Sequence, residues 1–373
     1  MNLRGKITWS ILLLILFFGS LASISTYYLT KKEFTTQVTK DLHNNAIALS
    51  HELYQIMRQS RDIAKALAND SLVKEYVTTT KPSSAQAEVM LDEFKDYNLG
   101  EMYSAIYILD KDGIAQISTD PRFLGQNYSF RNYFKSSIAG NDFVTTAIGV
   151  TSKELGYYFS SPIRSNLDDT ILGVLVVKLK TEHVERALRN HVSAGYEILL
   201  SDHYGIIILP SDSTKYLHSL GSLPPDSQAE LASTQAYATA EFEKLDYDVL
   251  MDIINQGFDS SKIIEIQDVH DNRDEIVAIG KVEDFPYYII FEGDMNIIDK
   301  VSIRASAVIA AFVLVAAILS VIIILIVVEV FLRQQQRTEQ KLLEKTTDLE
   351  RLNKLMVGRE LKMIELKKEI TSK

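Results

Sequence analysis

The sequence predicts an α+β fold in which a long N-terminal helix is followed by two antiparallel-sheet modules. Two transmembrane helices flank these modules, and a C-terminal coiled-coil helix ends the chain. Three observations predict this fold. Long apolar runs lie at residues 7–29 and 305–328. After the first run, apolar residues recur at helical spacing. The rest of the segment between the two runs contains stretches in which apolar and polar residues alternate, separated by tight-turn signals.

Composition limits the possible function classes. The 373 residues carry a formal charge of -10 and no cysteine, so neither a disulfide nor a thiolate metal site can form. This charge, without a Lys/Arg block interleaved with aromatics, argues against a nucleic-acid partner. The sequence lacks metal-ligand spacing among its His residues, a Gly-rich phosphate loop and a Gly-x-Ser-x-Gly motif. We therefore expect no enzyme activity, no metal and no cofactor.

The two apolar runs predict that the chain crosses a membrane twice. Each run is long enough to span a hydrocarbon core of about 30 Å as a helix. Arg4 and Lys6 precede the first run, and Arg333 and Arg337 follow the second. The positive-inside rule then predicts a two-pass protein of the cell (inner or plasma) membrane in which the segment between the two runs is extracytoplasmic. A cleaved signal peptide ending near Gly19–Ser23 is the alternative interpretation of the first run.

The sequence pattern of residues 30–103 predicts a long stalk helix and a shorter connecting helix. Apolar residues from Phe34 to Leu67 recur three or four positions apart, as in an amphipathic helix. The pattern then changes to strands, because residues 105–109 and 114–117 flank an Asp-Gly turn that favours a hairpin. Strands joined mostly by hairpins predict an antiparallel sheet with helices on its faces.

A similar order of strands restarts after residue 190. Residues 196–201 and 206–209 flank a second turn of similar composition, which indicates a structural duplication. The expected segments are a cytoplasmic N-terminus (1–6), a first transmembrane helix (7–29), the stalk and connecting helices (30–103), a membrane-distal module (104–190), a membrane-proximal module (191–303), a second transmembrane helix (304–328) and a cytoplasmic coiled-coil linker (329–373).

The stretch from Tyr128 to Lys178 carries the candidate binding site. The Arg131 guanidinium is a planar fork that suits bidentate carboxylate recognition, and Lys178 offers a second positive charge at the end of an apolar strand. Convergent polar groups among apolar walls are typical of a small-ligand pocket. The expected ligand-binding residues are Tyr128, Arg131, Tyr133, Thr151, Ser152, Tyr158 and Lys178.

Structural roles for the two cations are the alternative. Arg131 would then pair with Asp142 or Asp120, and Lys178 would simply end a strand in water. The sequence leaves both interpretations open, because it does not say which groups surround each side chain after folding.

This stretch resembles the double Cache (dCache) sensor domains of C4-dicarboxylate sensor kinases, which consist of two PAS-like antiparallel-sheet modules. The resemblance rests on residues 128–134, 149–152, 156–163 and 173–178. It covers the rest of the external segment in layout only. The resemblance implies that the membrane-distal module binds the ligand.

The same resemblance implies a role for each polar group. Tyr128 and Arg131 would hold one carboxylate, Lys178 would hold the other, and Thr151 and Ser152 would donate hydroxyl hydrogen bonds. The neighbouring amino-acid-sensing pattern expects a Trp after the Arg and a downstream Asp for the amine, and neither is evident. A carboxylate ligand is therefore favoured over an α-amino acid.

The C-terminal segment predicts a parallel homodimeric coiled coil. Apolar residues recur every seven positions from Leu342 to Ile370, while Lys345 and Arg359 weaken the seam. A lone charged helix in solvent is the alternative. The segment is similar to signalling linkers that precede PAS or kinase modules in two-component sensors. No kinase catalytic domain follows it in this sequence.

These patterns predict a membrane-bound homodimeric sensor that binds a small carboxylate outside the membrane and signals through a cytoplasmic coiled coil. A separate cytoplasmic kinase or response module would be its partner if the chain is a stand-alone subunit, and truncation of a longer kinase is the alternative. The rival hypotheses are an input subunit of a chemoreceptor or cyclic-nucleotide system and a non-signalling membrane scaffold.

Overall fold

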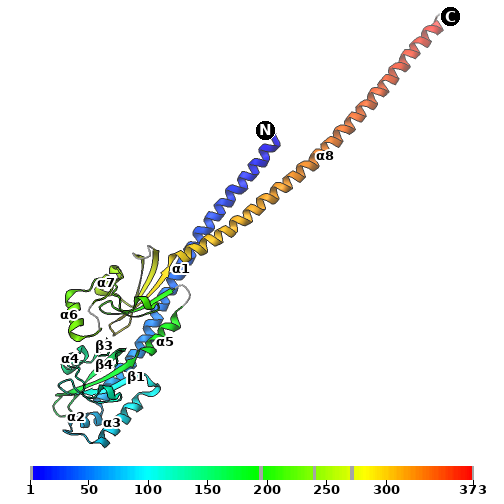
Figure 1. Ribbon diagram of the computed structural model, residues 1–373. Helices are drawn as coiled ribbons and strands as arrows, with labels where there is room; N and C mark the ends of the chain where they lie inside the picture. The colour runs from blue at the N-terminus through cyan, green and yellow to red at the C-terminus, as the bar shows by residue number, and fades with distance from the viewer. Residues whose placement is uncertain (1–2, 193–195, 238–240, 269–272, 372–373) are drawn as a thin grey trace. The chain divides into compact units, whose positions relative to one another are not determined.

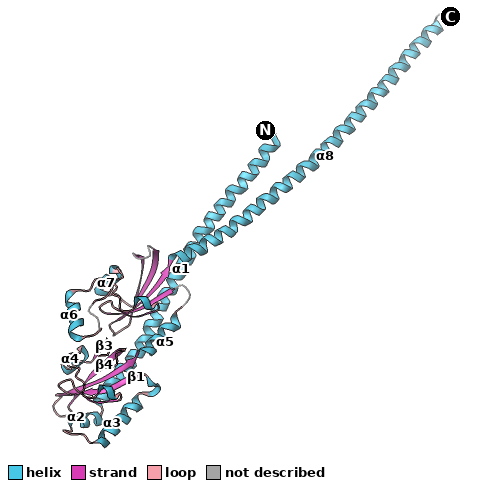
Figure 2. Ribbon diagram, viewed as in Figure 1, coloured by secondary structure: helices cyan, strands magenta, loops and turns pink. Residues whose placement is uncertain are grey.

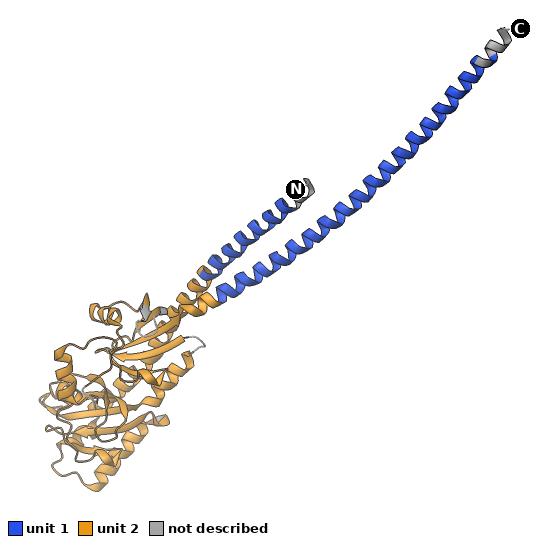
Figure 3. Ribbon diagram, turned by 45° about the horizontal axis from the view of Figure 1, so that its top comes forward, with its two compact units in different colours: residues 1–31, 301–373 blue, residues 32–300 orange. Residues whose placement is uncertain are grey.

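The computed structural model describes residues 3–192, 196–237, 241–268 and 273–371 (Figure 1). Small parts of the expected segments 1–6, 191–303 and 329–373 lie outside these residues. The chain divides into two compact units, residues 1–31 with 301–373 and residues 32–300 (Figure 3).

The first unit contains the outer parts of two long helices, α1 (Leu3–Asn69) and α8 (Met295–Thr371). Each helix has an 18-residue stretch apolar enough to cross a membrane, with mean hydropathies of 1.9 and 3.5. Inside this unit Gly19 lies against Val313, where an added Cβ atom would collide with the valine side chain. The two apolar stretches therefore pack against each other through a small residue.

The second unit contains two five-stranded antiparallel sheets (Figure 2), so the expected α+β fold is confirmed. The first sheet has the order β2-β1-β5-β4-β3 and the second β7-β6-β10-β9-β8. This shared order supports the expected duplication. The strands are β1 (Tyr103–Leu109), β2 (Ala115–Ser118), β3 (Phe143–Ile148), β4 (Leu155–Arg164), β5 (Ile171–Lys180), β6 (Tyr196–Asp202), β7 (Ile207–Pro210), β8 (Ser261–Asp268), β9 (Arg273–Lys281) and β10 (Tyr287–Asp294).

Shorter helices connect and cover the sheets. The expected shorter helix corresponds to α3 (Ser84–Tyr97), which begins at a capping box formed by Ser83 and the Gln86 side chain, and a further short helix, α2 (Ser71–Thr78), precedes it. The shorter helices are α2 (Ser71–Thr78), α3 (Ser84–Tyr97), η1 (Leu99–Glu101), η2 (Pro121–Phe123), α4 (Asn132–Ile138), α5 (Thr181–His191), η3 (Ser213–Lys215), α6 (Pro225–Thr234) and α7 (Asp248–Gln256).

The hairpins that open the two sheets are built alike. The Oδ1 atoms of Asp110 and Asp202 each accept hydrogen bonds from two backbone N–H groups of their own turn. Gly113 and Gly205 follow at φ of 81° and 76°, a region that glycine enters without steric cost. The two aspartates therefore provide a common reference point for comparing the first module (β1–β5 with α4) and the second module (β6–β10 with α6 and α7).

Each sheet has two different faces. One face of both sheets shares a single apolar core with the buried stripe of α1 between Leu42 and Leu67. The other face has its own core in each module, around Tyr107 and Tyr158 in the first and around Leu199 and Ile290 in the second. Side chains alternate between the faces of a strand, so this second face is where each module places side chains away from α1.

Candidate ligand-binding site

All seven predicted site residues lie on, or at the edge of, the face of the first sheet that points away from α1. Tyr128, Arg131 and Tyr133 come from the start of α4 and the turn before it, and Arg131 is the residue that precedes its first turn. The strands and the β3–β4 turn supply the others, which are Thr151, Ser152, Tyr158 and Lys178.

Lys178 is a buried cation that donates a hydrogen bond to a neutral group. The residue is 2% exposed, and its Nζ atom donates to the Ser152 hydroxyl at 2.7 Å. The same atom lies 5.6 Å from the centre of the Tyr158 ring. Burial lowers the pKa of Lys178 to about 8. The charge of Glu154 opposes this downward shift, and the charge of Arg131 adds to it. The ammonium group would therefore gain from an added negative charge.

Two glycines make room for this lysine. A Cβ atom on Gly156 would lie 2.3 Å from Lys178 Cε, and one on Gly149 would lie 2.3 Å from Ser152 Oγ and 2.9 Å from the Tyr158 hydroxyl. Sequence reasoning did not include either glycine among the site residues. The available signal was a glycine inside a strand pattern, which often marks the close approach of another group.

Arg131 is also 2% exposed, and its hydrogen-bond acceptors are backbone carbonyl groups. Nη1 donates to the carbonyl oxygen of Gln235 at 2.7 Å and more weakly to that of Thr234 at 3.2 Å. Nη2 donates to the carbonyl oxygen of Ile148 at 2.7 Å. Gln235 and Thr234 end α6, so this arginine of the first module holds the backbone of the second.

The alternative acid partners of Arg131 are engaged elsewhere. Asp120 forms an ion pair with Arg122 at 2.7 Å, and Asp142 forms one with Lys65 at 2.9 Å. The interpretation in which Arg131 pairs with one of these aspartates is therefore wrong. Lys178 does not end its strand in water either, because it is buried.

The phenol groups lie on the same face of the first sheet as the two cations. The hydroxyls of Tyr128 and Thr151 lie 2.7 Å apart, and the rings of Tyr133 and Tyr158 stack with centroids 5.2 Å apart. The Tyr107 hydroxyl, which sequence reasoning missed, donates to the Tyr133 hydroxyl at 3.0 Å. Burial raises the pKa of the Tyr133 and Tyr158 phenols far above neutral pH, so they remain uncharged hydrogen-bond donors.

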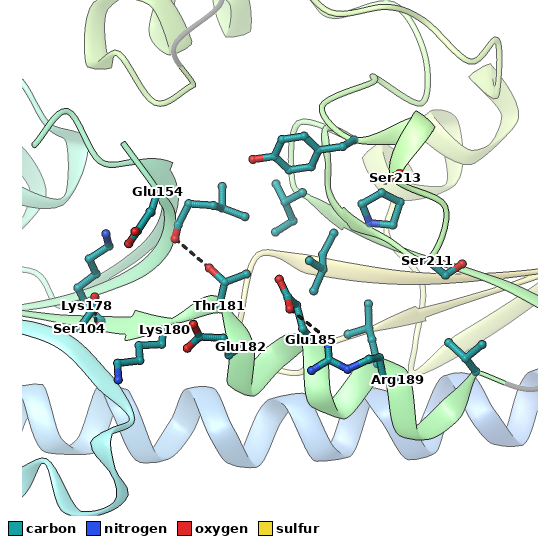
Figure 4. Close-up of a pocket in the computed structure, with 17 residues that line it drawn as sticks. Ser104, Glu154, Lys178, Lys180, Thr181, Glu182, Glu185, Arg189, Ser211 and Ser213 are labelled. Atoms are coloured by element: carbon teal, nitrogen blue, oxygen red, sulfur yellow. Dashed lines mark hydrogen bonds and ion pairs between the residues drawn. The ribbon is translucent and has the colours of Figure 1, made fainter. Parts of the chain in front are cut away.

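A cleft of about 1050 Å³ on the side of α5 is lined by one of the seven predicted residues, Lys178 (Figure 4). Lys178 and Glu154 stand at one end, and Glu185 and Arg189 of α5 form an ion pair along one wall. Tyr216 and neighbouring residues of the second module line the other wall. Lys178 thus borders both the aromatic face of the first sheet and an open cleft through which a solute would reach it.

The chemistry of this arrangement is compatible with recognition of an anion. Two buried cations, several hydroxyls and uncharged phenols lie close together, and such groups can hold a negatively charged ligand. Among the described residues, no group of three His, Asp or Glu side chains is arranged to hold a metal ion.

The Cache domain family model, dCache_1, matches residues 30–300. The chain belongs to the Cache family. Two relatives of the Cache segment are C4-dicarboxylate transport sensor proteins named DctB. The protein of Pseudomonas aeruginosa is 32% identical over 136 residues, which are 35% of this chain and 21% of the relative. The protein of Rhizobium meliloti is 24% identical over 164 residues, 43% of this chain and 25% of the relative. The matches thus span about a quarter or less of each relative's length.

Solved Cache structures share the fold. The sensor domain of the Vibrio cholerae histidine kinase DctB superposes with a TM-score of 0.57 at 19% identity, covering 69% of this chain and 98% of that domain. The ligand-binding domain of the Campylobacter jejuni chemoreceptor Tlp3, in complex with 4-methylisoleucine, gives 0.50 at 15% identity, covering 74% and 95%. At these identities the likeness concerns the fold of the Cache domain alone.

Proposed function

We propose that this chain is a membrane-bound sensor whose first Cache module binds a small dicarboxylate between Arg131 and Lys178. One observation carries the proposal: both cations are 2% exposed, yet neither has a carboxylate within 4 Å among the residues that the structure describes. A buried charge without an opposite charge costs several kcal/mol. A ligand with one carboxylate at each end would offset that cost at both cations.

The local geometry suits this ligand. Nη1 and Nη2 of Arg131 already hold two separate oxygen atoms, those of Gln235 and Ile148, each at 2.7 Å. A carboxylate presents two oxygens to such a fork and adds the missing charge. At the other end, a carboxylate would replace or share the Ser152 hydroxyl as the acceptor for Lys178.

The relatives support a carboxylate as the ligand class. The proteins from Pseudomonas aeruginosa and Rhizobium meliloti are C4-dicarboxylate transport sensor proteins, and the stronger match is 32% identical over its 136 residues. We therefore infer that the ligand of this chain belongs to the same chemical class, small dicarboxylic acids.

We infer that the contact between Arg131 and α6 connects ligand binding to the rest of the chain. The Ile148 N–H also donates to the carbonyl oxygen of Ala236 at 2.7 Å, so the same two segments are joined twice. A carboxylate that competes with Gln235 for the guanidinium would loosen this joint. The second module ends in β10, and α8 begins at the next residue, Met295. The contact would have an intact and a loosened state, and a ligand shifts the equilibrium between them only if it binds the two states with different affinities.

The output would be a cytoplasmic coiled coil formed with a second copy of the chain. The heptad side chains Leu349, Met356 and Met363 are 61–67% exposed in the single chain, and their seven-residue spacing fits an identical helix. The two apolar stretches of α1 and α8 would cross the membrane, with both chain ends in the cytoplasm. A separate kinase or response module would read the coiled coil.

Thermal-shift and calorimetric titration of the full-length chain in nanodiscs test this function. We expect succinate to stabilise the protein, and Arg131→Ala and Lys178→Met each to weaken binding by about tenfold or more. Arg164→Ala, which removes an ion pair with exposed Asp169, is the matched control and should bind normally. If no dicarboxylate in a panel binds, or if Arg131→Ala binds as well as wild type, the proposed function fails.

A further inference from the structure

The second module has a counterpart of Lys178, and it is a glutamate. In the first sheet Lys178 pairs with Ala105 on β1, five residues before the turn residue Asp110. In the second sheet Glu292 pairs with Glu197 on β6, five residues before the equivalent Asp202. The register of the two sheets therefore places Glu292 where the first module has its buried cation.

Two neighbouring positions that are uncharged in the first module carry carboxylates in the second. Glu197 stands where the first module has Ala105. Glu275 lies on β9 opposite Asp294, and its counterpart Gly156 lies on β4 opposite Lys180. The second module thus carries three carboxylates at the positions of a lysine, a glycine and an alanine.

A lysine of the second module occupies this acidic site. The Lys215 Nζ atom lies 2.9 Å from Glu292 Oε2 and 3.0 Å from Glu197 Oε2. It also lies 5.9 Å from the centre of the Tyr247 ring. Glu292 is 3% exposed, and the Oε1 atoms of Glu292 and Glu197 are buried without a hydrogen-bond partner in the described structure. Two carboxylates that face each other across neighbouring strands therefore share one ammonium group and each leave an oxygen unmatched.

Among the described residues, the cation within 4 Å of Glu292 is Lys215. On this face β8 contributes Ile264 and Ile266, and the aspartates of α7 that cover the face are exposed. Asp294, two residues further along β10, accepts a hydrogen bond from the Asn296 N–H. One ammonium group thus pairs with two carboxylates, of which Glu292 is buried and Glu197 is partly exposed. Burial raises the pKa of Glu292 to about 8. The charge of Lys215 opposes this rise, and the charge of Glu197 adds to it.

We propose that Glu292, Glu197 and Lys215 form a proton-binding site, through which the second module senses pH independently of the dicarboxylate. One proton between the two unmatched oxygens removes the excess negative charge and gives both oxygens a hydrogen bond. Loss of that proton as the pH rises leaves two carboxylates opposed across β6 and β10, where like charges repel. Glu292 lies three residues before the start of α8, so a shift of β10 moves the base of that helix directly.

The direction of the pH effect follows from linkage. A carboxyl whose pKa is raised by folding binds its proton more tightly in the folded state, so stability falls as the pH rises between the unfolded and folded pKa values. We expect the melting temperature of the full-length chain to fall between about pH 6 and about pH 8 for this reason. Lys178 titrates near the same range, so the informative quantity is the difference between wild type and a Glu292 variant.

The experiment compares wild type with Glu292→Gln, a neutral side chain of similar shape, and with Glu283→Gln as an exposed control. We expect Glu292→Gln to lose most of the pH dependence and Glu283→Gln to keep it. The infrared band of a protonated carboxyl should be present in wild type near neutral pH, fade toward about pH 9 and be absent from Glu292→Gln.

Three results would overturn the proposal: an unchanged pH slope in Glu292→Gln, no such infrared band, or stabilisation at high pH by sodium or calcium ions that requires Glu292, which would indicate a cation site. Succinate binding separates this inference from the proposed function. Arg131→Ala should lose succinate and keep the pH response, and Glu292→Gln should do the reverse.

Discussion

The Nζ atom of Lys178 donates to the Ser152 hydroxyl at 2.7 Å, while the carbon chain behind it passes a glycine, Gly156, whose missing Cβ would lie 2.3 Å from Lys178 Cε. A buried lysine held by a neutral hydroxyl is costly for folding and useful for anion binding. Burying this cation in the sheet costs free energy, and a bound carboxylate would offset that cost.

The affinity for a dicarboxylate should depend on pH through Lys178. Burial lowers the pKa of Lys178 to about 8, so the ammonium form that attracts a carboxylate is lost as the pH rises above that value. We expect affinity to fall by up to about tenfold per pH unit above about pH 8. Calorimetric titrations should show this slope in wild type. An affinity that stays constant up to about pH 10 would exclude a role for the lysine charge.

Gly156→Ala should damage the site through Lys178. The added methyl group collides with the lysine chain and forces it to move, so we expect a loss of stability of about 1–3 kcal/mol together with weaker succinate binding. Chemical denaturation and calorimetry would measure the two effects. Gly358→Ala is the control, because nothing lies within 4 Å of that position. Wild-type affinity in Gly156→Ala would mean that the lysine position is not critical.

Ligand binding should loosen the segment that follows α6. If a carboxylate displaces the carbonyl oxygens of Thr234 and Gln235 from Arg131, peptides covering residues 225–237 should exchange amide hydrogen faster when succinate is present. Hydrogen exchange with mass spectrometry measures this directly. Slower exchange in this segment would mean that the ligand strengthens the joint, and the proposed coupling would then have the wrong sign.

The C-terminal heptads should bring two copies together. Because the chain has no cysteine, single cysteines report proximity without background. Leu349→Cys and Met356→Cys should form intermolecular disulfides in membranes, whereas Lys354→Cys on the opposite side of the helix should not. Equal crosslinking at all three positions would point to random collision and contradict a coiled coil.

The sequence predicted the main elements because their signals are local. The apolar spacing from Phe34 to Leu67 indicated the long helix, and the turns at Asp110 and Asp202 indicated the two hairpin-started sheets. The seven site residues could be gathered from one stretch because α4, the β3–β4 turn, β4 and β5 are neighbours in both chain and space.

Other features depend on contacts between distant segments. Two of the three carbonyl partners of Arg131, those of Thr234 and Gln235, lie about a hundred residues away at the end of α6, and no residue type marks a backbone acceptor. Tyr107 joins the site only because β1 pairs with β5 in a particular register. The correspondence of Glu292 with Lys178 likewise requires the strand pairing of both sheets, which composition and spacing do not determine.

The preference for two carboxylates over one is the most direct test of the site. Calorimetry should compare succinate with propionate, a monocarboxylate of similar character, on wild type and on Lys178→Met. The account predicts that wild type prefers succinate by about tenfold or more and that Lys178→Met binds both acids alike. A preference for succinate that survives in Lys178→Met would contradict the claim that Lys178 holds the second carboxylate.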